Sequence, residues 1–304
     1  LGPIFLISLL VTAALLTQAE ARWLVDWTAL GLSAAGAGAL SYVLTVLLAG
    51  LTLLAASQMA VALVNWLSTL IVKPMVLPSM DFSKGIASDA RTLVVVPTLL
   101  TSSDHIENLI EALEVRFLAN RAERLHFGLL TDFADADRES LPADEALVSL
   151  VRTRVDELNA KYSPGKDRPG DDRFFLFHRA RQWNAAEGIW MGYERKRGKL
   201  SALNALLRTT GESNPFALVV GRTAVLAGIK YVITLDTDTQ LPRDAAQQFV
   251  GAMAHPLNHP LFDASQRCVV EGYGILQPRV AISLSGANRS RYAGLYGGDP
   301  GIDP

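Results

Sequence analysis

The chain has 304 residues, half of them apolar, and its 28 Lys and Arg are nearly balanced by 30 Asp and Glu. A net charge of −2 argues against a nucleic-acid binder driven by electrostatics, and the apolar content argues against intrinsic disorder. The single cysteine, Cys268, excludes an internal disulfide and a zinc site built from thiolates. We expect Cys268 to be an inert core residue of a strand.

Charge is unevenly distributed along the chain. Residues 1–72 hold only three charged side chains, Glu20, Arg22 and Asp26, whereas the rest has the composition of a soluble domain. We therefore expect a membrane segment over 1–72, a linker rich in Pro, Ser and Gly over 73–90, and a soluble domain over 91–304. The chain begins without Met and shows no end signal, so we interpret it as part of a longer protein, incomplete at its C-terminus.

The start of the membrane segment predicts a spanning helix. Residues 1–17 are almost wholly apolar, and about 20 apolar residues cross a bilayer. The core of a signal peptide is the alternative, but no basic start precedes it and no clean small-residue cleavage site follows it.

Residues 28–72 form a second uncharged run, which is too long for one crossing. Two interpretations remain: two spanning helices, or one over roughly 30–55 followed by a helix in the membrane interface over 56–72. Gln58, Asn65 and Trp66 favour the interfacial helix. A buried hairpin of a soluble protein is a third alternative. Basic residues after the run predict that the soluble domain is cytoplasmic.

The soluble domain alternates strands and helices, which predicts an α/β fold with a mostly parallel sheet covered on both faces. The expected strands are 93–96, 126–130, 174–177 and 231–235, with another beginning at 269, and the expected helices are 102–117, 142–159, 200–207 and 242–253. Ligands of such sheets bind beyond the carboxyl ends of the strands, where Thr98, Asp132, Asp236 and Asp238 lie. The sequence has neither the glycine pattern of a dinucleotide site nor a P-loop.

Asp236-Thr237-Asp238 follows an apolar strand and is a candidate metal site. Two carboxylates one residue apart supply the oxygen ligands that Mg²⁺ or Mn²⁺ prefers, and such a cation would stabilise a diphosphate leaving group. A solvated turn before the helix at Pro242 is the alternative.

The densest basic cluster, Glu194–Lys199, is a candidate phosphate site in which Gly198 would allow close backbone approach. A solvated loop is the alternative. Trp183 and Trp190 flank the cluster and suit either stacking on a ring or core packing. Asp132 suits hydrogen bonds from a nucleobase or ribose, or a turn. The five histidines lack metal-ligand spacing and receive no role.

Together these pieces resemble a known family. Leu93-Val-Val-Val-Pro-Thr98, Leu130-Thr-Asp132, Arg197-Gly-Lys-Leu-Ser-Ala-Leu-Asn204 and Ile233-Thr-Leu-Asp-Thr-Asp-Thr-Gln-Leu-Pro242 resemble, in that order, motifs of GT-A glycosyltransferases of the cellulose-synthase kind. The match is closer to the glycosyltransferase domain of cyclic β-1,2-glucan synthases, glycosyltransferase family 84. Longer stretches such as Trp190-Met-Gly-Tyr-Glu-Arg-Lys-Arg-Gly-Lys-Leu200 and Val270-Glu-Gly-Tyr-Gly-Ile-Leu-Gln-Pro-Arg279 carry that resemblance, which covers about residues 61–304.

The resemblance implies a GT-A fold, Rossmann-like and mostly parallel, and it implies roles for single residues. Thr98 and Asp132 would contact the uridine of UDP-glucose, and Lys199 would meet the diphosphate. Asp236 and Asp238 would hold Mg²⁺ or Mn²⁺, while Asn204 and Gln277 would line the donor and acceptor sites.

The general base that deprotonates the acceptor in this inverting reaction has no convincing candidate in the chain. In related enzymes it lies well after the Asp-x-Asp strand, so we expect it beyond Pro304. Glu271 and Asp299 stand in the wrong motif context.

The expected function is therefore a membrane-bound inverting glucosyltransferase segment that extends β-1,2-glucan. The expected partners are UDP-glucose, the glucan acceptor, membrane lipid and a C-terminal phosphorylase-like domain absent from this chain, with no nucleic acid. The expected location is the bacterial inner membrane, crossed more than once, with the catalytic domain in the cytoplasm. The alternatives are another processive β-glycan synthase of the cellulose or chitin type, and a nucleotide-sugar-binding scaffold without turnover.

Overall fold

The computed structural model describes residues 6–8, 10–14, 34–71, 76–162, 172–208 and 214–278. The chain divides into two compact units, one made of residues 1–76 and 277–304 and the other of residues 77–276. Glu20, Arg22 and Asp26 lie outside the described residues, and so does Asp299.

The first unit contains one long helix, α2, over Ala34–Ile71. Among the described residues, one stretch, Val46–Ser68, has the length and composition to cross a membrane. The described parts of the expected first helix, residues 6–8 and 10–14, are helical.

The expected division of the second apolar run near residue 55 is wrong, because α2 continues through it without a break. Two polar residues on either side of this position form hydrogen bonds inside the helix. The Thr52 hydroxyl donates to the carbonyl of Leu48, and the Ser57 hydroxyl donates to that of Leu54, both at 2.7 Å. Polar side chains bonded back to the preceding turn leave the helix intact, so their presence does not mark its end.

The second unit is built around a five-stranded sheet in the order β6-β3-β2-β1-β7. Its strands are β1 (Thr92–Leu100), β2 (Leu125–Phe133), β3 (Phe174–His178), β6 (Leu218–Val220) and β7 (Tyr231–Thr234). β1, β2, β3 and β7 are parallel, and β6 is antiparallel to β3 at one edge. The prediction of an α/β fold with a mostly parallel sheet is confirmed.

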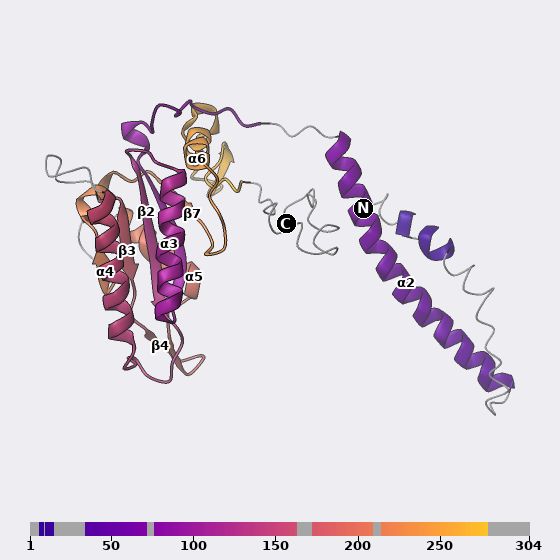
Figure 1. The fold of residues 1–304 in the computed structure, drawn as a ribbon. Coiled ribbons are helices and arrows are strands. Elements are labelled where there is room, and N and C mark those ends of the chain that lie inside the picture. The colour runs from indigo at the N-terminus through magenta and orange to yellow at the C-terminus, as the bar shows by residue number, and fades with distance from the viewer. Residues whose placement is uncertain are drawn as a thin grey trace. The chain divides into compact units, whose positions relative to one another are not determined.

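Helices cover both faces of this sheet (Figure 1). They are α3 (Ser103–Ala119), α4 (Asp144–Tyr162), α5 (Arg195–Arg208) and α6 (Ala245–Ala254), with short 3₁₀ turns η2 (Ser88–Ala90), η3 (Thr223–Gly228) and η4 (Pro256–Asn258). α3 and α4 lie side by side on one face, and α5 packs on the other against β1 and β2. The strands are therefore buried on both sides, which explains their uninterrupted apolar runs.

Alternation along the strands divides the core into two layers. In β1, Val94 and Val96 face the layer of α3, α4 and α6, whereas Leu93 and Val95 face the layer of α5 and η3. The linker contributes as well, because Ile86 and Ala90 are buried in the first layer. Residues 77–90 thus pack as part of the α/β unit.

Two short hairpins were not foreseen as such from the sequence. β4 (Gln182–Asn184) pairs with β5 (Ile189–Met191), and β8 (Leu261–Asp263) pairs with β9 (Cys268–Glu271). Cys268 does lie in a strand, but it is exposed, so the expectation that it is a core residue is wrong. A two-stranded ribbon buries little of either face, and its apolar residues do not become core.

Candidate functional site

The parallel register brings the polar strand ends to one edge of the sheet. Leu99 of β1 pairs with Asp132 of β2, and Thr131 of β2 pairs with His178 at the end of β3. Asp236 follows β7, which pairs with β1 on its other side. The expectation that Thr98, Asp132 and Asp236 lie at the carboxyl ends of neighbouring strands is confirmed.

A buried cluster of charges lies at this edge. Arg179 donates to both carboxylate oxygens of Asp132, from Nε at 2.8 Å and from Nη2 at 2.9 Å. Lys199 Nζ lies 3.0 Å from Asp132 Oδ2 and donates to the carbonyl of Thr98 at 2.6 Å. Three residues predicted to bind the donor therefore meet here, and Thr98 takes part through its main chain.

The central charges of this cluster, Asp132 and Lys199, are almost completely removed from water. Asp132 is 1% exposed and Lys199 is 3% exposed. Burial lowers the pKa of the Lys199 ammonium, while the neighbouring Asp132 carboxylate opposes that shift. Two cations share one carboxylate, so the cluster carries one excess positive charge, which suits an anionic ligand.

The backbone before α5 explains how Lys199 reaches the sheet. Glu194 and Arg195 both have positive φ, 51° and 47°, and together they reverse the chain after β5. The helix then begins at Arg195, so most of the basic cluster forms its first turns instead of a loop. Lys199 and Leu203, one turn apart, are the buried residues of α5.

Two glycines allow the chain to close over Asp132. A Cβ at Gly192 would lie 2.3 Å from Asp132 Oδ2, and one at Gly198 would lie 2.1 Å from the carbonyl oxygen of Tyr193. Neither distance is compatible with a side chain. Gly198 allows a close approach to the main chain of Tyr193, and its predicted approach to a ligand stays a prediction.

The two acids of the Asp-x-Asp turn are exposed, and Asp236 forms an ion pair with Lys196 in the first turn of α5. α5 thus contacts both acidic positions of the sheet edge, Asp132 through Lys199 and Asp236 through Lys196. Within the described ranges, no three His, Cys, Asp or Glu side chains gather into a metal site. Two carboxylates still fit Mg²⁺ or Mn²⁺, because such cations often take one or two protein carboxylates and complete their shell with phosphate oxygens and water.

Arg116 is part of this site, and sequence reasoning missed it. It lies in the last turn of α3, is 4% exposed, and donates hydrogen bonds to main-chain carbonyls of the Asp-x-Asp turn. A signal was present, because Arg116 stands between Leu113 and Phe117 on the face that the apolar pattern marks as buried. A charged residue on that face needs a partner.

A second buried ion pair supports the loop that follows β2. Arg181 pairs with Asp144 at the start of α4 and donates from Nε to the carbonyl of Ala134 at 2.6 Å. Its guanidinium lies 4.7 Å from the centre of the Phe133 ring. This pair was not foreseen, since its two members are 37 residues apart and nothing local links them.

His178 received no role from the sequence, yet it is 3% exposed beside the cluster. Its Nδ1 lies 2.9 Å from the Thr131 hydroxyl, and its Nε2 is buried without a hydrogen-bond partner. Burial lowers the pKa of this imidazole to about 4, although Asp132 and Asp144 oppose the shift. The ring is therefore neutral at neutral pH.

Asn204 and Glu271 do not join the cluster. Asn204 is exposed on α5, Glu271 is exposed on β9, and Gln277 falls in the other unit of the chain. Trp183 and Trp190 form a cross-strand pair on the β4–β5 hairpin, with ring centres 5.8 Å apart, and Trp183 is 51% exposed. The roles proposed for Asn204 and Gln277 stay predictions.

No family model matches the chain. A search of characterised proteins finds cyclic β-(1,2)-glucan synthase NdvB of Rhizobium meliloti (strain 1021), to which the chain is 44% identical over 252 residues. The match covers 83% of this chain and 9% of the synthase, so the chain spans about a tenth of that relative's length. At this identity the chain is homologous to one segment of that synthase, which confirms the resemblance to cyclic β-1,2-glucan synthases seen in the motifs.

Proposed function

We propose that this chain is the glucosyltransferase segment of a cyclic β-1,2-glucan synthase and transfers glucose from UDP-glucose to a growing glucan. The observation that carries the proposal is the 44% identity over 252 residues to a protein of that name. The charge cluster of Asp132, Arg179 and Lys199 at the carboxyl edge of the sheet supports it, because this edge is where α/β sheets bind ligands.

In this proposal the first turns of α5 bind the diphosphate. Lys199 and Arg179 supply the excess positive charge, and Lys196 is free to turn from Asp236 to a phosphate when a metal takes its place. A carboxylate has about four acceptor positions, and Arg179 and Lys199 use three of those of Asp132. Because Asp132 is 1% exposed, direct contact with uridine requires a shift of the segment at Gly192.

Asp236 and Asp238 would hold Mg²⁺ or Mn²⁺, which would neutralise the diphosphate as UDP leaves. The acceptor hydroxyl attacks the anomeric carbon from the face opposite UDP, and the configuration inverts. The proton of that hydroxyl goes to a carboxylate outside the cluster described above. We further propose that the enzyme lies in the bacterial inner membrane with its α/β unit in the cytoplasm, where UDP-glucose is made.

Incubation of membranes bearing the intact synthase with UDP-[¹⁴C]glucose and Mn²⁺ tests the proposal. We expect labelled glucan whose linkage analysis gives β-1,2 bonds, and we expect Asp238→Ala to abolish it while the protein still accumulates. A β-1,4 product would favour the cellulose or chitin alternative. UDP binding without incorporation of label would favour the scaffold.

A further inference from the structure

The buried guanidinium of Arg116 donates hydrogen bonds to the main chain of the Asp236–Asp238 turn. Arg116 Nη2 donates to the carbonyls of Thr237 and Thr239, both at 2.8 Å, and more weakly to that of Asp236 at 3.4 Å. Arg116 Nε adds a bond to Thr239 at 3.2 Å. One side chain from α3 thus binds three carbonyls that lie about 120 residues further along the chain.

These bonds fix the direction in which the acids point. Each carbonyl belongs to a planar peptide unit, so holding the carbonyls of Asp236 and Thr237 orients the planes on both sides of Thr237. Those planes set the backbone dihedrals from which the side chains of Asp236 and Asp238 project. The turn is also closed by its own bond, from Thr239 N–H to the carbonyl of Asp236 at 3.1 Å.

The rest of the last turn of α3 continues the same support. The Asn120 side chain donates to the carbonyl of Leu241 at 3.4 Å and accepts from Ala246 N–H at 3.0 Å. Asp244 N–H donates to the carbonyl of Ala119 at 3.1 Å. The whole segment from the Asp-x-Asp turn to the start of α6 therefore rests on the end of one helix.

Burying this guanidinium is costly, which argues that its contacts serve more than packing. Arg116 Nη1 is buried and has no hydrogen-bond partner. Burial lowers the pKa of Arg116, and the nearby negative charge of Asp238 opposes that shift. A buried cation with an unused donor contributes less net stability than its four hydrogen bonds suggest, so packing alone does not account for a guanidinium at this place.

We propose that Arg116 is a positioning residue that presents Asp236 and Asp238 to one divalent cation bound together with the donor diphosphate. The inference rests on the proposed function. It separates two properties of Arg116: its fork of donors, which orients the turn, and its positive charge, which by itself would weaken cation binding.

Mn²⁺ binding by the purified full chain in detergent tests the inference without any need for turnover. Free Mn²⁺ is measured by electron paramagnetic resonance during titration in the presence of UDP. We expect Arg116→Met and Arg116→Lys each to weaken Mn²⁺ binding by about tenfold or more, as the loss of outer-shell partners does at other metal sites. Thermal melting without metal checks that each variant folds. If Arg116→Met does not fold, Mn²⁺ binding by Arg116→Lys is compared with that of the wild type.

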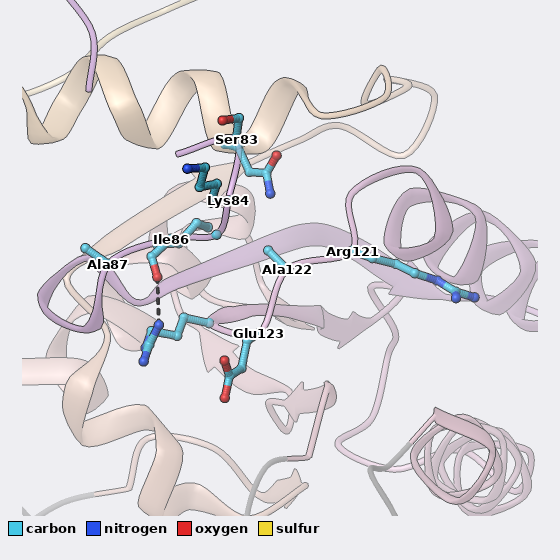
Figure 2. A pocket seen from close by; sticks show the side chains of 10 residues that line it. Ser83, Lys84, Ile86, Ala87, Arg121, Ala122 and Glu123 are labelled. Carbon is cyan, nitrogen blue, oxygen red and sulfur yellow. Dashed lines mark hydrogen bonds between the residues drawn. The ribbon is translucent and has the colours of Figure 1, made fainter. Parts of the chain in front are cut away.

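Arg124→Met is the matched control. Arg124 also donates to a main-chain carbonyl, that of Ile86 at 2.9 Å, but at the opposite end of the sheet. It lies beside a cavity of about 400 Å³ lined by Ser83–Ala87, by Arg121–Arg124 just before β2, and by Gln247. Figure 2 shows this bond as the dashed line that reaches Ile86. This variant should bind Mn²⁺ as the wild type does.

The outcomes separate the inference from the function on which it rests. Wild-type Mn²⁺ binding by Arg116→Lys would mean that the fork of donors is not needed, and tighter or unchanged binding by Arg116→Met would mean that the fork does not orient the acids. Either result overturns the inference and leaves the proposed transferase intact. Failure of the wild type to bind Mn²⁺ with UDP would instead overturn the metal assignment, and the inference with it.

Discussion

Asp132 pairs with two cations, the almost fully buried Lys199 and the partly buried Arg179. Arg179 donates to both carboxylate oxygens of Asp132, and Lys199 pairs with one of the same oxygens. Lys199 also donates to the Thr98 carbonyl. Removing one member of a buried ion cluster costs more than the cluster contributes, because the remaining charges lose their partners. Loss of Asp132 and loss of Lys199 should therefore have different effects on the stability of the fold.

Replacement of Asp132 and of Lys199 should separate stability from ligand binding. Asp132→Asn leaves two buried cations without a carboxylate and should lower the free energy of unfolding by about 3–5 kcal/mol. Lys199→Met leaves Asp132 paired with Arg179, so it should retain the fold and lose UDP affinity. Urea unfolding followed by circular dichroism, together with UDP titration, gives both quantities. An unchanged urea midpoint for Asp132→Asn would contradict the burial argument.

His178 predicts how stability depends on pH. The folded imidazole has a pKa of about 4 instead of 6.5, so between these values the unfolded chain binds a proton that the folded chain does not. The contribution of His178 is therefore complete above pH 6.5 and is lost as pH falls toward 4, by on the order of 3 kcal/mol. Urea midpoints at pH 7 and pH 5 should differ less in His178→Gln than in the wild type. Exposed His259 is the control, since His259→Gln should keep the wild-type difference.

The β4–β5 hairpin and the start of α5 pack together against the carboxyl end of β2. Main-chain bonds between Trp190 and Ala136, at 2.9 and 3.0 Å, attach the hairpin to the segment after β2. Two residues beyond Trp190, Gly192 lies against the Asp132 carboxylate, and the chain then reverses into α5. The position of Lys199 therefore depends on the conformation of about ten residues before it.

Gly192→Ala tests this dependence. The new Cβ would lie 2.3 Å from Asp132 Oδ2 and must displace either the hairpin or the carboxylate. We expect UDP binding to fall by about tenfold or more and the protein to be destabilised by about 1–3 kcal/mol, the usual cost of overpacking. Gly274→Ala is the control, because its Cβ would meet only a methyl carbon of Val269 at 3.8 Å. Normal UDP binding by Gly192→Ala would show that the hairpin does not set the site.

The whole chain joins an apolar helix to an α/β unit whose proposed donor is a cytoplasmic metabolite. α2 contains one stretch fit to cross a membrane, Val46–Ser68, and the expected first helix would make the second crossing. An even number of crossings places the chain's start and the α/β unit on the same side. In that arrangement we expect Glu20, Arg22 and Asp26 on the outer side of the membrane.

Labelling of cysteines in intact cells checks this topology. Because Cys268 is exposed, it should react with a membrane-impermeant maleimide after permeabilisation and stay unlabelled before it. In a Cys268→Ser background, Ala21→Cys should react in intact cells and Ser83→Cys should not. Reaction at Ser83→Cys from outside would refute both the orientation and the use of a cytoplasmic donor.

The sequence by itself determined the class of fold, the order of the main strands and helices along the chain, and the resemblance to cyclic β-1,2-glucan synthases. Each of these depends on local patterns: apolar runs such as Leu93–Val96, the helical spacing of Ile106 to Phe117, and motifs read along the chain. It also placed Thr98, Asp132 and Asp236 at one edge, because parallel strands end on the same side of a sheet.

Only the tertiary structure decided which charges meet. Arg116 lies about 120 residues before the turn that it holds, Arg179 lies 47 residues after Asp132, and Arg181 lies 37 residues after Asp144. Such partners are chosen by the packing of helices on the sheet, which no local spacing encodes. The same reason explains the errors: the exposure of Cys268 and the continuity of α2 through residue 55 depend on what packs against each segment and on hydrogen bonds inside the helix, not on hydropathy alone.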